Sequence, residues 1–448
     1  MKSSLFSQGT LQGAFPRNKN RLLRFITFAK LGALVKIWYI NPYAGGPGVG
    51  RYWRAYSLAK EWMRFGHEVT VVSPSYHHLM TQGGFANCSH EVDGVVYRFV
   101  PSIKYEGNGF LRLFSMVLFG PSFFIWALFR LHRERPNLII YSSAHPFGYP
   151  WAWILARLLG AKLFFEVRDI WPLSLIEIAG LNPRNPIVTL LGWIERFAYR
   201  SADRVVSLLP NALPHMCSKG MAPEKYLYVP NGVSLEAFAG KIDHSSPLVS
   251  KVHSLKSQGF FVFVYTGALG EPNAMHKFVD SLQYLGSQVT ENVRFFMIGR
   301  GEQEKEINKR CVELGYDFVV FHPQVDKATV IDVLRVADAG FFLTNDLPIY
   351  RFGISPNKMF DYMAAELPFI AVYRTNGPDV ISSSGCGFNV LPDAPEELAA
   401  AFTKMAACDE RALKEMGSKG AEHLAEFYEY KVLARKVIDA AFETELVN

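Results

Sequence analysis

The chain shows the same pattern twice: a short apolar strand, a loop containing glycine, an amphipathic helix and a second strand. The first copy runs from a strand at 35–40 through a helix at 51–65 to a strand at 69–72. The second copy begins with an apolar strand at 261–265. Because a helix between two strands returns the chain to the same end of a sheet, this pattern predicts parallel sheets covered by helices. We therefore expect an α/β fold with doubly wound sheets.

At 448 residues the chain is too long for one ordinary core, and a polar segment separates the two arrays. Further strands are expected at 138–141, 162–165, 204–208, 294–298, 318–321 and 339–343, and further helices at 151–159, 277–285, 302–314, 330–337, 394–413 and 421–442. The expected organisation is an N-terminal extension (1–34), a first domain (35–240), a linker (241–258), a second domain (259–420) and a C-terminal helix (421–448). Ligands of open α/β sheets bind at the carboxyl ends of the strands, so we expect a cleft there.

The segment Ser355-Pro356-Asn357-Lys358-Met359-Phe360-Asp361 predicts a helix start that binds an anion. Ser355 suits the N-cap and Pro356 the first helical position. Lys358 lies in the first turn, where a cation and free N–H groups together favour a bound anion. Asp361 follows about 4.5 Å further along the axis, where a carboxylate could accept hydrogen bonds from a diol. Alone, the segment fits a nucleotide diphosphate site and an ordinary capped surface helix equally well.

The loop Gly45-Gly46-Pro47-Gly48-Val49-Gly50 could belong to a dinucleotide site, but its spacing is G-x-G-x-G. The next strand ends Val72-Ser73-Pro74, without the carboxylate that would hold a ribose of NAD. This disfavours a dehydrogenase. A plain tight loop and a loop that approaches a phosphate or sugar remain equally open, because glycine allows close backbone approach.

Composition excludes several classes of function. The formal charge of +6 comes without a long basic block, so nucleic acid is not indicated as a partner. The five cysteines are scattered and never paired as CxxC, which fits a reducing compartment and predicts neither disulfides nor a metal site.

Two apolar stretches bear on membranes. The basic segment 1–34 has an apolar run too short for a signal peptide, so we expect a disordered extension. The stretch 113–129 carries no charge and is flanked by Arg112 and Arg130, but Gly120-Pro121 interrupts it. It predicts a buried helix or an in-plane membrane-contact helix rather than a span.

Several segments in order resemble the retaining GT-B glycosyltransferases of family four, particularly bacterial enzymes that build surface polysaccharides. The matching segments are the opening glycine loop, 58–62, 66–72, Glu166-Val167-Arg168-Asp169-Ile170-Trp171-Pro172, 202–205, 229–233, Tyr265-Thr266-Gly267, Ile298-Gly299-Arg300-Gly301 and the Ser355 segment. The resemblance covers about residues 35–440. It implies two facing Rossmann-like domains, an acceptor side first and a nucleotide-sugar side second. It also implies transfer of a sugar, with UDP as the expected nucleotide and without a cofactor or metal, to a glycan or lipid-linked acceptor.

The resemblance also implies which residues of the two arrays bind the donor. Donor contacts are expected from Gly46, Gly48, Gly267, Arg300, Ser355, Asn357, Lys358 and Asp361. The family commonly has two glutamates with seven residues between them; here Asp361 holds the second position and Gly353 the first. Relatives often have a basic residue after Thr-Gly, where this chain has Ala268. Lys358 is therefore expected to carry more of the charge on the leaving diphosphate, as a catalytic residue.

Residues of the first array are expected on the acceptor side. Arg168 and Asp169 are catalytic candidates that could orient sugar or acceptor hydroxyls, whereas Glu166 is expected to be a satisfied buried carboxylate. His145 and His77 follow strands and could contact the acceptor, although a structural histidine or a solvated loop fits them as well. A cytoplasmic location follows, either free or on the inner face of the cell membrane.

Two other functions remain open from the sequence. A non-hydrolysing sugar-nucleotide epimerase shares the two-domain architecture. A catalytically silent protein that only binds nucleotide sugar is supported by Gly353, which leaves the first glutamate position empty.

Overall fold

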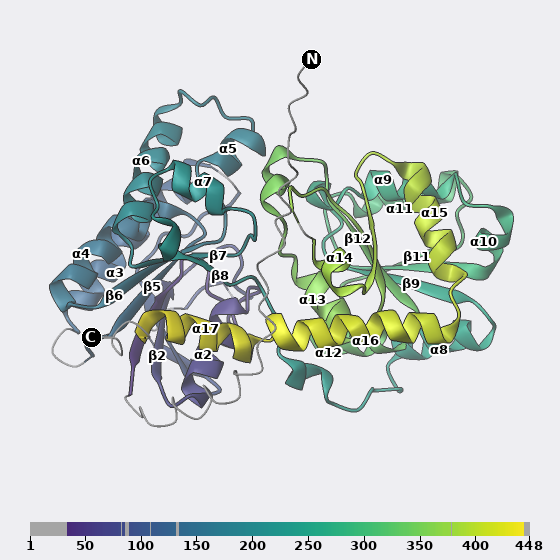
Figure 1. Ribbon diagram of the computed structural model, residues 1–448, viewed down its shortest axis with the longest axis horizontal. Coiled ribbons are helices and arrows are strands. Elements are labelled where there is room, and N and C mark those ends of the chain that lie inside the picture. The colour runs from purple at the N-terminus through teal and green to yellow at the C-terminus, as the bar shows by residue number, and fades with distance from the viewer. Residues whose placement is uncertain are drawn as a thin grey trace, which may run out of the picture.

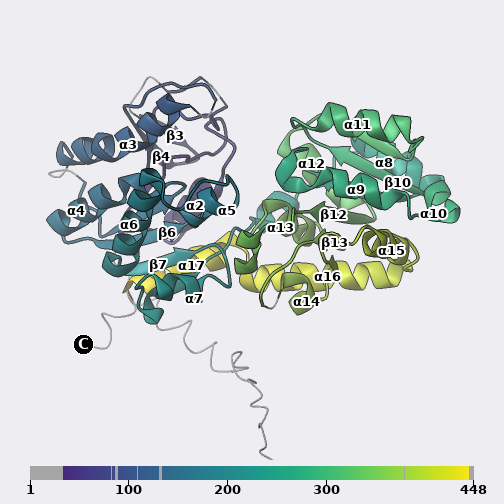
Figure 2. The same cartoon turned by 90° about the horizontal axis from the view of Figure 1, so that it is seen from above.

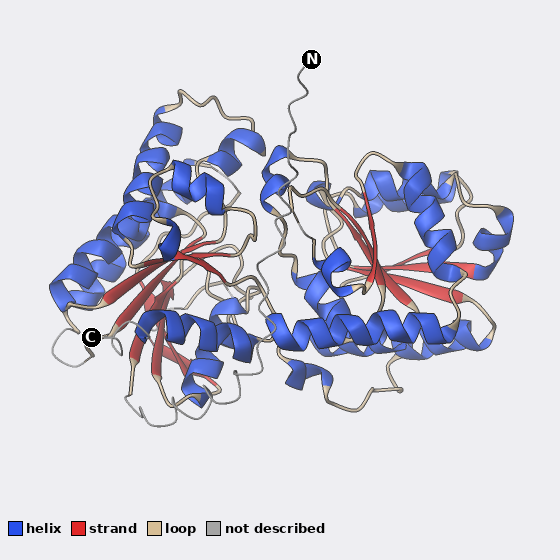
Figure 3. Cartoon of the chain, viewed as in Figure 1, coloured by secondary structure: helices blue, strands red, loops and turns tan. Residues whose placement is uncertain are grey.

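The computed structural model describes residues 34–442 except 82, 86–88, 108, 131–133 and 378. The chain forms two sheets side by side, each sandwiched between helices (Figures 1 and 3). The segment 1–33, which includes almost all of the expected extension, lies outside the described residues.

The first sheet has eight strands in the order β3-β4-β2-β1-β5-β6-β7-β8. Their bounds are β1 Lys36–Ile40, β2 Glu68–Pro74, β3 Ser89–Val92, β4 Val95–Val100, β5 Leu138–Ser143, β6 Lys162–Val167, β7 Arg204–Ser207 and β8 Tyr226–Tyr228. Neighbours pair in parallel, as in the register Ile37 to Val69, except the antiparallel pair β3 and β4. The carboxyl ends of the parallel strands therefore share one edge.

Helices cover both faces of this sheet, because alternate residues of each strand are apolar on opposite faces. The helices are α2 Arg54–Arg64, α3 Phe110–Leu128, α4 Tyr149–Leu159, α5 Leu173–Glu177, α6 Pro186–Ser201 and α7 Leu213–Ser218. Helices α3, α4 and α6 pack on the face that presents Trp38 and Ile40. Helix α2 packs on the face that presents Ile37 and Tyr39.

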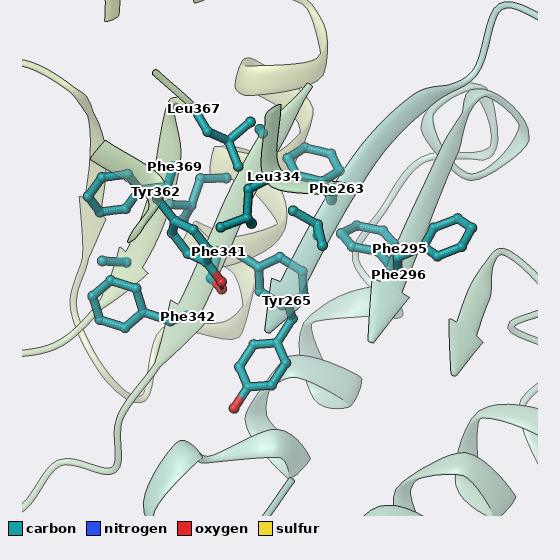
Figure 4. Close-up of a cluster of buried hydrophobic side chains, with 14 of the residues drawn as sticks. Phe263, Tyr265, Phe295, Phe296, Leu334, Phe341, Phe342, Tyr362, Leu367 and Phe369 are labelled. Atoms are coloured by element: carbon teal, nitrogen blue, oxygen red, sulfur yellow. Dashed lines mark hydrogen bonds between the residues drawn. The ribbon is translucent and has the colours of Figure 1, made fainter. Parts of the chain in front are cut away.

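The second sheet has six parallel strands in the order β11-β10-β9-β12-β13-β14. Its strands are β9 Phe261–Thr266, β10 Val293–Ile298, β11 Val319–His322, β12 Ala339–Leu343, β13 Phe369–Val372 and β14 Gly387–Val390. Its helices are α8 Pro247–Ser257, α9 Met275–Leu282, α10 Ser287–Asn292, α11 Glu304–Glu313, α12 Lys327–Val336, α13 Asn357–Ala364, α14 Val380–Ser384 and α15 Pro395–Ala406. Figure 4 shows rings from β9, β10, β12 and α13 meeting in one buried cluster around Phe341.

The last two helices join the halves. Helix α16 (Glu410–Phe427) runs along the second sheet and packs against α13, and α17 (Tyr430–Phe442) continues along the first sheet and packs against α2 (Figures 1 and 2). Between the two helices, the backbone at Tyr428 and Glu429 pairs with Val233 in a short β-bridge. Val233 lies where the chain first crosses from one half to the other.

The α/β prediction is confirmed, and four local predictions need correction. Strands β3, β4, β8 and β14 were not expected: β3, β8 and β14 are short, whereas β4 was missed although its six residues are largely apolar. The expected linker contains α8, whose Leu248, Val249 and Val252 are buried. The helix expected at 394–413 ends at Ala406, since Asp409 caps a new helix. The helix expected at 421–442 is divided between α16 and α17.

Candidate active site

Loops after the carboxyl ends of strands join the two halves. The side chain of Asn231, after β8, donates to the backbone oxygen of Ser355 at 2.7 Å, and its backbone N–H donates to the Ser355 hydroxyl at 2.9 Å. Arg351, after β12, forms a two-pronged ion pair with Glu177, after β6, at 2.7 and 2.9 Å. An open groove of about 440 Å³ lies beside this pair. The carboxyl edges of the two sheets therefore face each other, which is where ligands of such sheets bind.

Helix α13 begins at this junction. It starts at Asn357, with Pro356 in the N-cap position and no side-chain cap. This corrects the expected N-cap by one residue: the Ser355 hydroxyl accepts from Asn231 and does not cap the helix. The Met359 N–H donates to the Pro356 oxygen at 3.2 Å, so among the described residues the N–H groups of Asn357 and Lys358 are the first-turn donors open to an anion. Asn357 is exposed at this end.

The Lys358 ammonium lies beneath the loop that follows β9. Nζ donates to the Tyr265 hydroxyl and to Oδ1 of Asn273, both at 2.9 Å, and lies 4.2 Å from the centre of the Tyr265 ring. These contacts are all with neutral groups, and burial lowers the pKa of Lys358 to about 7. A cation that is desolvated without a carboxylate partner is suited to a bound anion.

Glycines bring two loops together around this lysine. A Cβ on Gly267, whose φ is +141°, would lie 3.0 Å from Nζ of Lys358. A Cβ on Gly299 would lie 1.8 Å from the Gly267 oxygen, and one on Gly301 would lie 1.9 Å from the Leu269 oxygen. The loops after β9 and β10 therefore touch backbone to backbone, which only glycine permits. Arg300, between these glycines, is exposed.

Asp361 is on the same helix as Lys358 but already has a partner. Its Oδ2 forms an ion pair at 2.5 Å with Nζ of Lys327, the first residue of α12. Asp361 is largely buried, whereas Lys327 is partly exposed. Oδ1 has no hydrogen bond among the described residues, so the carboxylate keeps acceptor capacity for a diol.

On the facing edge, Glu166 is the satisfied buried carboxylate that its sequence position predicts. It accepts from Arg54 at 2.8 Å, from Tyr39 at 2.7 Å and from Ser142 at 2.7 Å. Burial would raise the pKa of Glu166, but Arg54 and the two hydroxyls outweigh it and hold the pKa below its usual value. Glu166 is structural.

The next residues of that loop are accessible. The Arg168 guanidinium lies over the Tyr52 ring at 4.8 Å. Asp169 is exposed as a residue, but desolvation of its carboxyl group by the surrounding protein raises its pKa, and the charge of Arg168 opposes this shift only in part. No hydrogen bond or ion pair in the described part of the chain joins Arg168 or Asp169 to Lys358.

The glycine loop after β1 closes on itself. The Gly46 N–H donates to the Gly50 oxygen at 3.1 Å, and a Cβ on Gly46 would lie 2.5 Å from the Tyr97 hydroxyl. This explains Gly46 by packing. Gly48 is exposed at the tip, with open space where a Cβ would be.

His77 and His145 are buried beside one tyrosine. Both rings stand edge-on to Tyr43, at 5.6 and 5.9 Å. Burial lowers the pKa of His145 to about 3 and that of His77 to about 4, so both are neutral at pH 7. Nε2 of His77 bonds the Ala44 oxygen at 3.0 Å, and no partner is found for Nδ1 of His145 among the described residues. A solvated loop is therefore wrong for His77.

Gly353 has a packing reason of its own. Its φ is +91°, and a Cβ would lie 2.7 Å from the ring of Pro210 in the other half of the molecule. The backbone of Asn211 donates to the Phe352 oxygen at 3.0 Å in the same junction. No side chain fits at position 353.

Sequence reasoning missed the groups that hold these residues. Tyr265 and Asn273 position Lys358, Lys327 pairs with Asp361, and Arg54 pairs with Glu166. Only Tyr265 had a signal, since it precedes the Thr-Gly pair. In the described ranges, no group of three or more His, Cys, Asp or Glu side chains could hold a metal ion.

Two family models match the chain. Residues 48–232 match the glycosyl transferase 4-like domain, and residues 261–407 match the glycosyl transferases group 1 domain. The first match covers the strands of the first sheet except β1, and the second covers all the strands of the second sheet.

The similar proteins agree with these matches. WbjE of Pseudomonas aeruginosa, named as a glycosyltransferase, is 23% identical over 82% of this chain and 88% of its own length. WcaI of Escherichia coli K12, a glycosyl transferase named for colanic acid biosynthesis, is 22% identical over 68% of this chain and 75% of its own. The structure of Anabaena HepE in complex with UDP and glucose superposes with a TM-score of 0.62 at 15% identity, covering 92% of this chain and all of that one.

Proposed function

Because the chain is a glycosyltransferase with the GT-B fold, carrying a 4-like domain and a group 1 domain, we propose that it transfers a hexose with retention. The proposed donor is a UDP-sugar, and the acceptor is a hydroxyl of a glycan or lipid-linked glycan in surface polysaccharide synthesis. The name of WcaI supports the pathway, and the UDP complex of HepE supports the nucleotide.

The observation that carries the proposal is the desolvated ammonium of Lys358, whose partners among the described residues are neutral. Negative charge develops on the diphosphate as the sugar leaves, and a desolvated cation stabilises it more than a solvated one would. The uncapped N-terminus of α13 adds N–H donors, and Gly267 lets the diphosphate approach the ammonium closely. We include Arg300, exposed on the adjoining loop, in the proposed donor site.

We assign the ribose to Asp361. Its free Oδ1 can accept from the 2′- and 3′-hydroxyls while Lys327 holds Oδ2. The wild type should then bind UDP about tenfold more tightly than 2′-deoxy-UDP, since one charged hydrogen bond is lost. Asp361→Ala should bind both nucleotides equally. If Asp361→Ala still preferred UDP over 2′-deoxy-UDP by the same factor as the wild type, this assignment would be refuted.

The first half is the proposed acceptor side, over residues 35–240, and the donor side spans 259–420. Asp169 and Arg168 lie at the carboxyl edge of the first sheet, and a carboxyl group whose pKa is raised by desolvation is typical of functional sites, which supports the proposal. His145 and His77 stay proposed acceptor-side residues, and both rings are buried and neutral.

The experiment begins with a thermal-shift screen of UDP-, GDP- and ADP-sugars, because ligands that bind the native state raise its stability. The best donor is then used to compare turnover of the wild type, Lys358→Ala and Lys404→Ala. Lys404 is the matched control, an exposed lysine 4.4 Å from the Phe388 ring in the same half. We expect Lys358→Ala to lose about a hundredfold or more in kcat and Lys404→Ala to be unchanged.

Equal turnover in the two lysine variants would remove Lys358 from the mechanism. The anomeric configuration of the product, read by NMR, tests retention separately. A product of inverted configuration would contradict retention without affecting the assignment of the donor site.

The proposed location is cytoplasmic, on the inner face of the cell membrane. Its support is the apolar character of the outer side of α3.

A further inference from the structure

Helix α3 is apolar on two sides. Ser115, Phe119, Phe123 and Ala127 recur at i+4 and are buried against the first sheet. A second stripe recurs at intervals of three and four residues on the side away from the sheet: Phe110, Phe114, Val117, Pro121, Ile125 and Leu128. A helix of a water-soluble surface would carry polar residues on that side.

This outer stripe is uncovered. Phe110 is 77% exposed, and Phe129, just after the helix, is 83% exposed. By length and composition α3 could cross a membrane, and only 28% of its most apolar window is buried. A core helix that passes the same test would be mostly buried. Packing in the core therefore does not account for the exposed apolar side chains of α3.

The apolar surface continues over two neighbouring helices. Helix α4 packs against α3, and α6 packs against α4, on one face of the sheet. Helix α4 exposes Ile154 and Leu158, and α6 exposes Leu190 and Trp193, of which Trp193 is 73% exposed. Figures 1 and 2 show α3 and α4 at the end of the molecule away from the second sheet, so a partner there would leave the junction of the sheets open.

The exposed charges on these helices are all positive. Helices α4 and α6 expose Arg157, Arg196 and Arg200. The one carboxylate on the three helices, Glu195, is buried and bonds His215 at 3.2 Å. Arg130, after α3, lies over Trp126 and pairs with Glu134. An apolar surface with arginines and no exposed carboxylate complements an anionic bilayer.

Two other occupants fit less well. Phe119, Phe123 and Ala127 are fully buried in the fold, so α3 cannot leave the sheet to cross a bilayer. In a two-fold dimer the same patch would meet itself. Arg157 and Arg196 would then face like charges, with no exposed carboxylate on these helices to pair with them.

We propose that the outer surface of α3, α4 and α6 is a membrane-docking face, which seats α3 in the plane of an anionic bilayer. Phe110, Phe114, Val117, Ile125 and Leu128 enter the acyl boundary, and the arginines contact lipid phosphates. This deepens the proposed membrane location and does not depend on sugar transfer. It holds the carboxyl edge of the first sheet near lipid-linked acceptors.

The test is flotation of the full chain with vesicles of phosphatidylcholine alone or with about a third phosphatidylglycerol. The variant Phe114→Ser/Ile125→Ser removes two residues of the outer stripe, and Val312→Ser/Leu314→Ser is the matched control. Val312 is 74% exposed, on α11 of the other half. We expect the wild type and the control to float with anionic vesicles, and the stripe variant to lose about tenfold or more of that binding.

Arg157→Gln/Arg196→Gln should bind anionic vesicles more weakly than the wild type, and its residual binding should depend less on added salt. The unfolding temperature of each variant shows whether it is folded. If Phe114→Ser/Ile125→Ser does not fold, Val117→Ser/Leu128→Ser is used as the stripe variant instead. The proposal is overturned if the wild type floats with neither kind of vesicle, or if the stripe variant floats as well as the control. So does a lipid-free dimer that only the stripe variant converts to monomer. Donor turnover measured without lipid tests the proposed sugar transfer, and its result does not depend on the outcome of the flotation.

Discussion

Gly353 occupies the position where relatives in the resembling family place a glutamate, and the structure gives it a steric role. With φ at +91° and the Pro210 ring 2.7 Å from any Cβ, the position excludes side chains at the junction of the two halves. The glycine is therefore no sign of a silent enzyme, because the contact with Pro210 is reason enough for it.

Gly353→Glu should lower stability without raising turnover. The strained backbone and the overlap with Pro210 cost about 1–3 kcal/mol each, and Gly353→Ala should suffer a similar loss because its Cβ meets the same ring. Thermal unfolding and donor turnover of both variants measure this. Higher turnover in Gly353→Glu at unchanged stability would show that a glutamate can act here.

Donor binding should weaken as pH rises through 7. Burial lowers the pKa of Lys358 to about 7, so the ammonium is charged below that pH and neutral above it. Only the charged form attracts a diphosphate, so bound donor raises the pKa and binding takes up a proton. The association constant of a UDP-sugar should fall about tenfold per pH unit between 7 and 8.5. Calorimetric titration measures both the affinity and the proton uptake.

Lys358→Arg is the control for this pH dependence, because a guanidinium stays charged throughout the range. Its affinity should be flat from pH 6 to 8.5. A wild-type profile that is equally flat would mean that Lys358 keeps its proton without the donor.

Single residues of the site could be predicted from the sequence only where they belong to a recognisable local pattern, such as a helix start. Lys358 and Asp361 stood out because a helix start with a lysine in its first turn is unusual. Tyr265, Asn273 and Lys327 belong to other loops and helices, and their side chains meet the site only through the fold. The packing of Gly353 against Pro210 likewise spans 143 residues, which no local pattern can reveal.

At the scale of elements, sequence periodicity predicted the central strands and missed several strands at or next to the sheet edges, namely β3, β4, β8 and β14. β1, β9 and β12 read clearly because both faces of a parallel sheet are buried. β3 alternates between exposed and half-buried residues at an edge, so its signal is weak. The joint between α16 and α17 was missed because the helical pattern continues on both sides, while Tyr428 and Glu429 pair with Val233 instead.

Arg54 should be essential to the assembly of these elements. It links α2 to β6 through Glu166, and its guanidinium also donates to the oxygens of Val229 and Pro230 where the chain leaves the first half. Arg54→Ala leaves Glu166 buried without a counter-charge and should cost about 3–5 kcal/mol. The double variant Arg54→Met/Glu166→Leu should cost less. Denaturant unfolding compares them, and equal losses would show that the charge of Glu166 is not the cause.

At the scale of the whole molecule, the end of the chain stabilises its beginning. The buried side of α17 packs against α2, and Nε1 of Trp62 donates to the Ala434 oxygen at 3.0 Å. The halves are thus tied at the crossing after β8, at the joint between α16 and α17, and by the contacts of Ser355 and Arg351. Stability of the first half should depend on residues that follow the second in sequence.

Leu433→Ala tests this dependence, because Leu433 is fully buried among residues of the first sheet although it lies near the end of the chain. The cavity should cost about 2–5 kcal/mol. Hydrogen exchange should then accelerate in α2, β1 and β2 and stay slow in β9, β10 and β12. Lys431→Ala, on the exposed side of α17, is the control and should change neither sheet. Equal acceleration in both sheets would show that the halves unfold as one unit, and no change in α2 would show that α17 is not part of the first core.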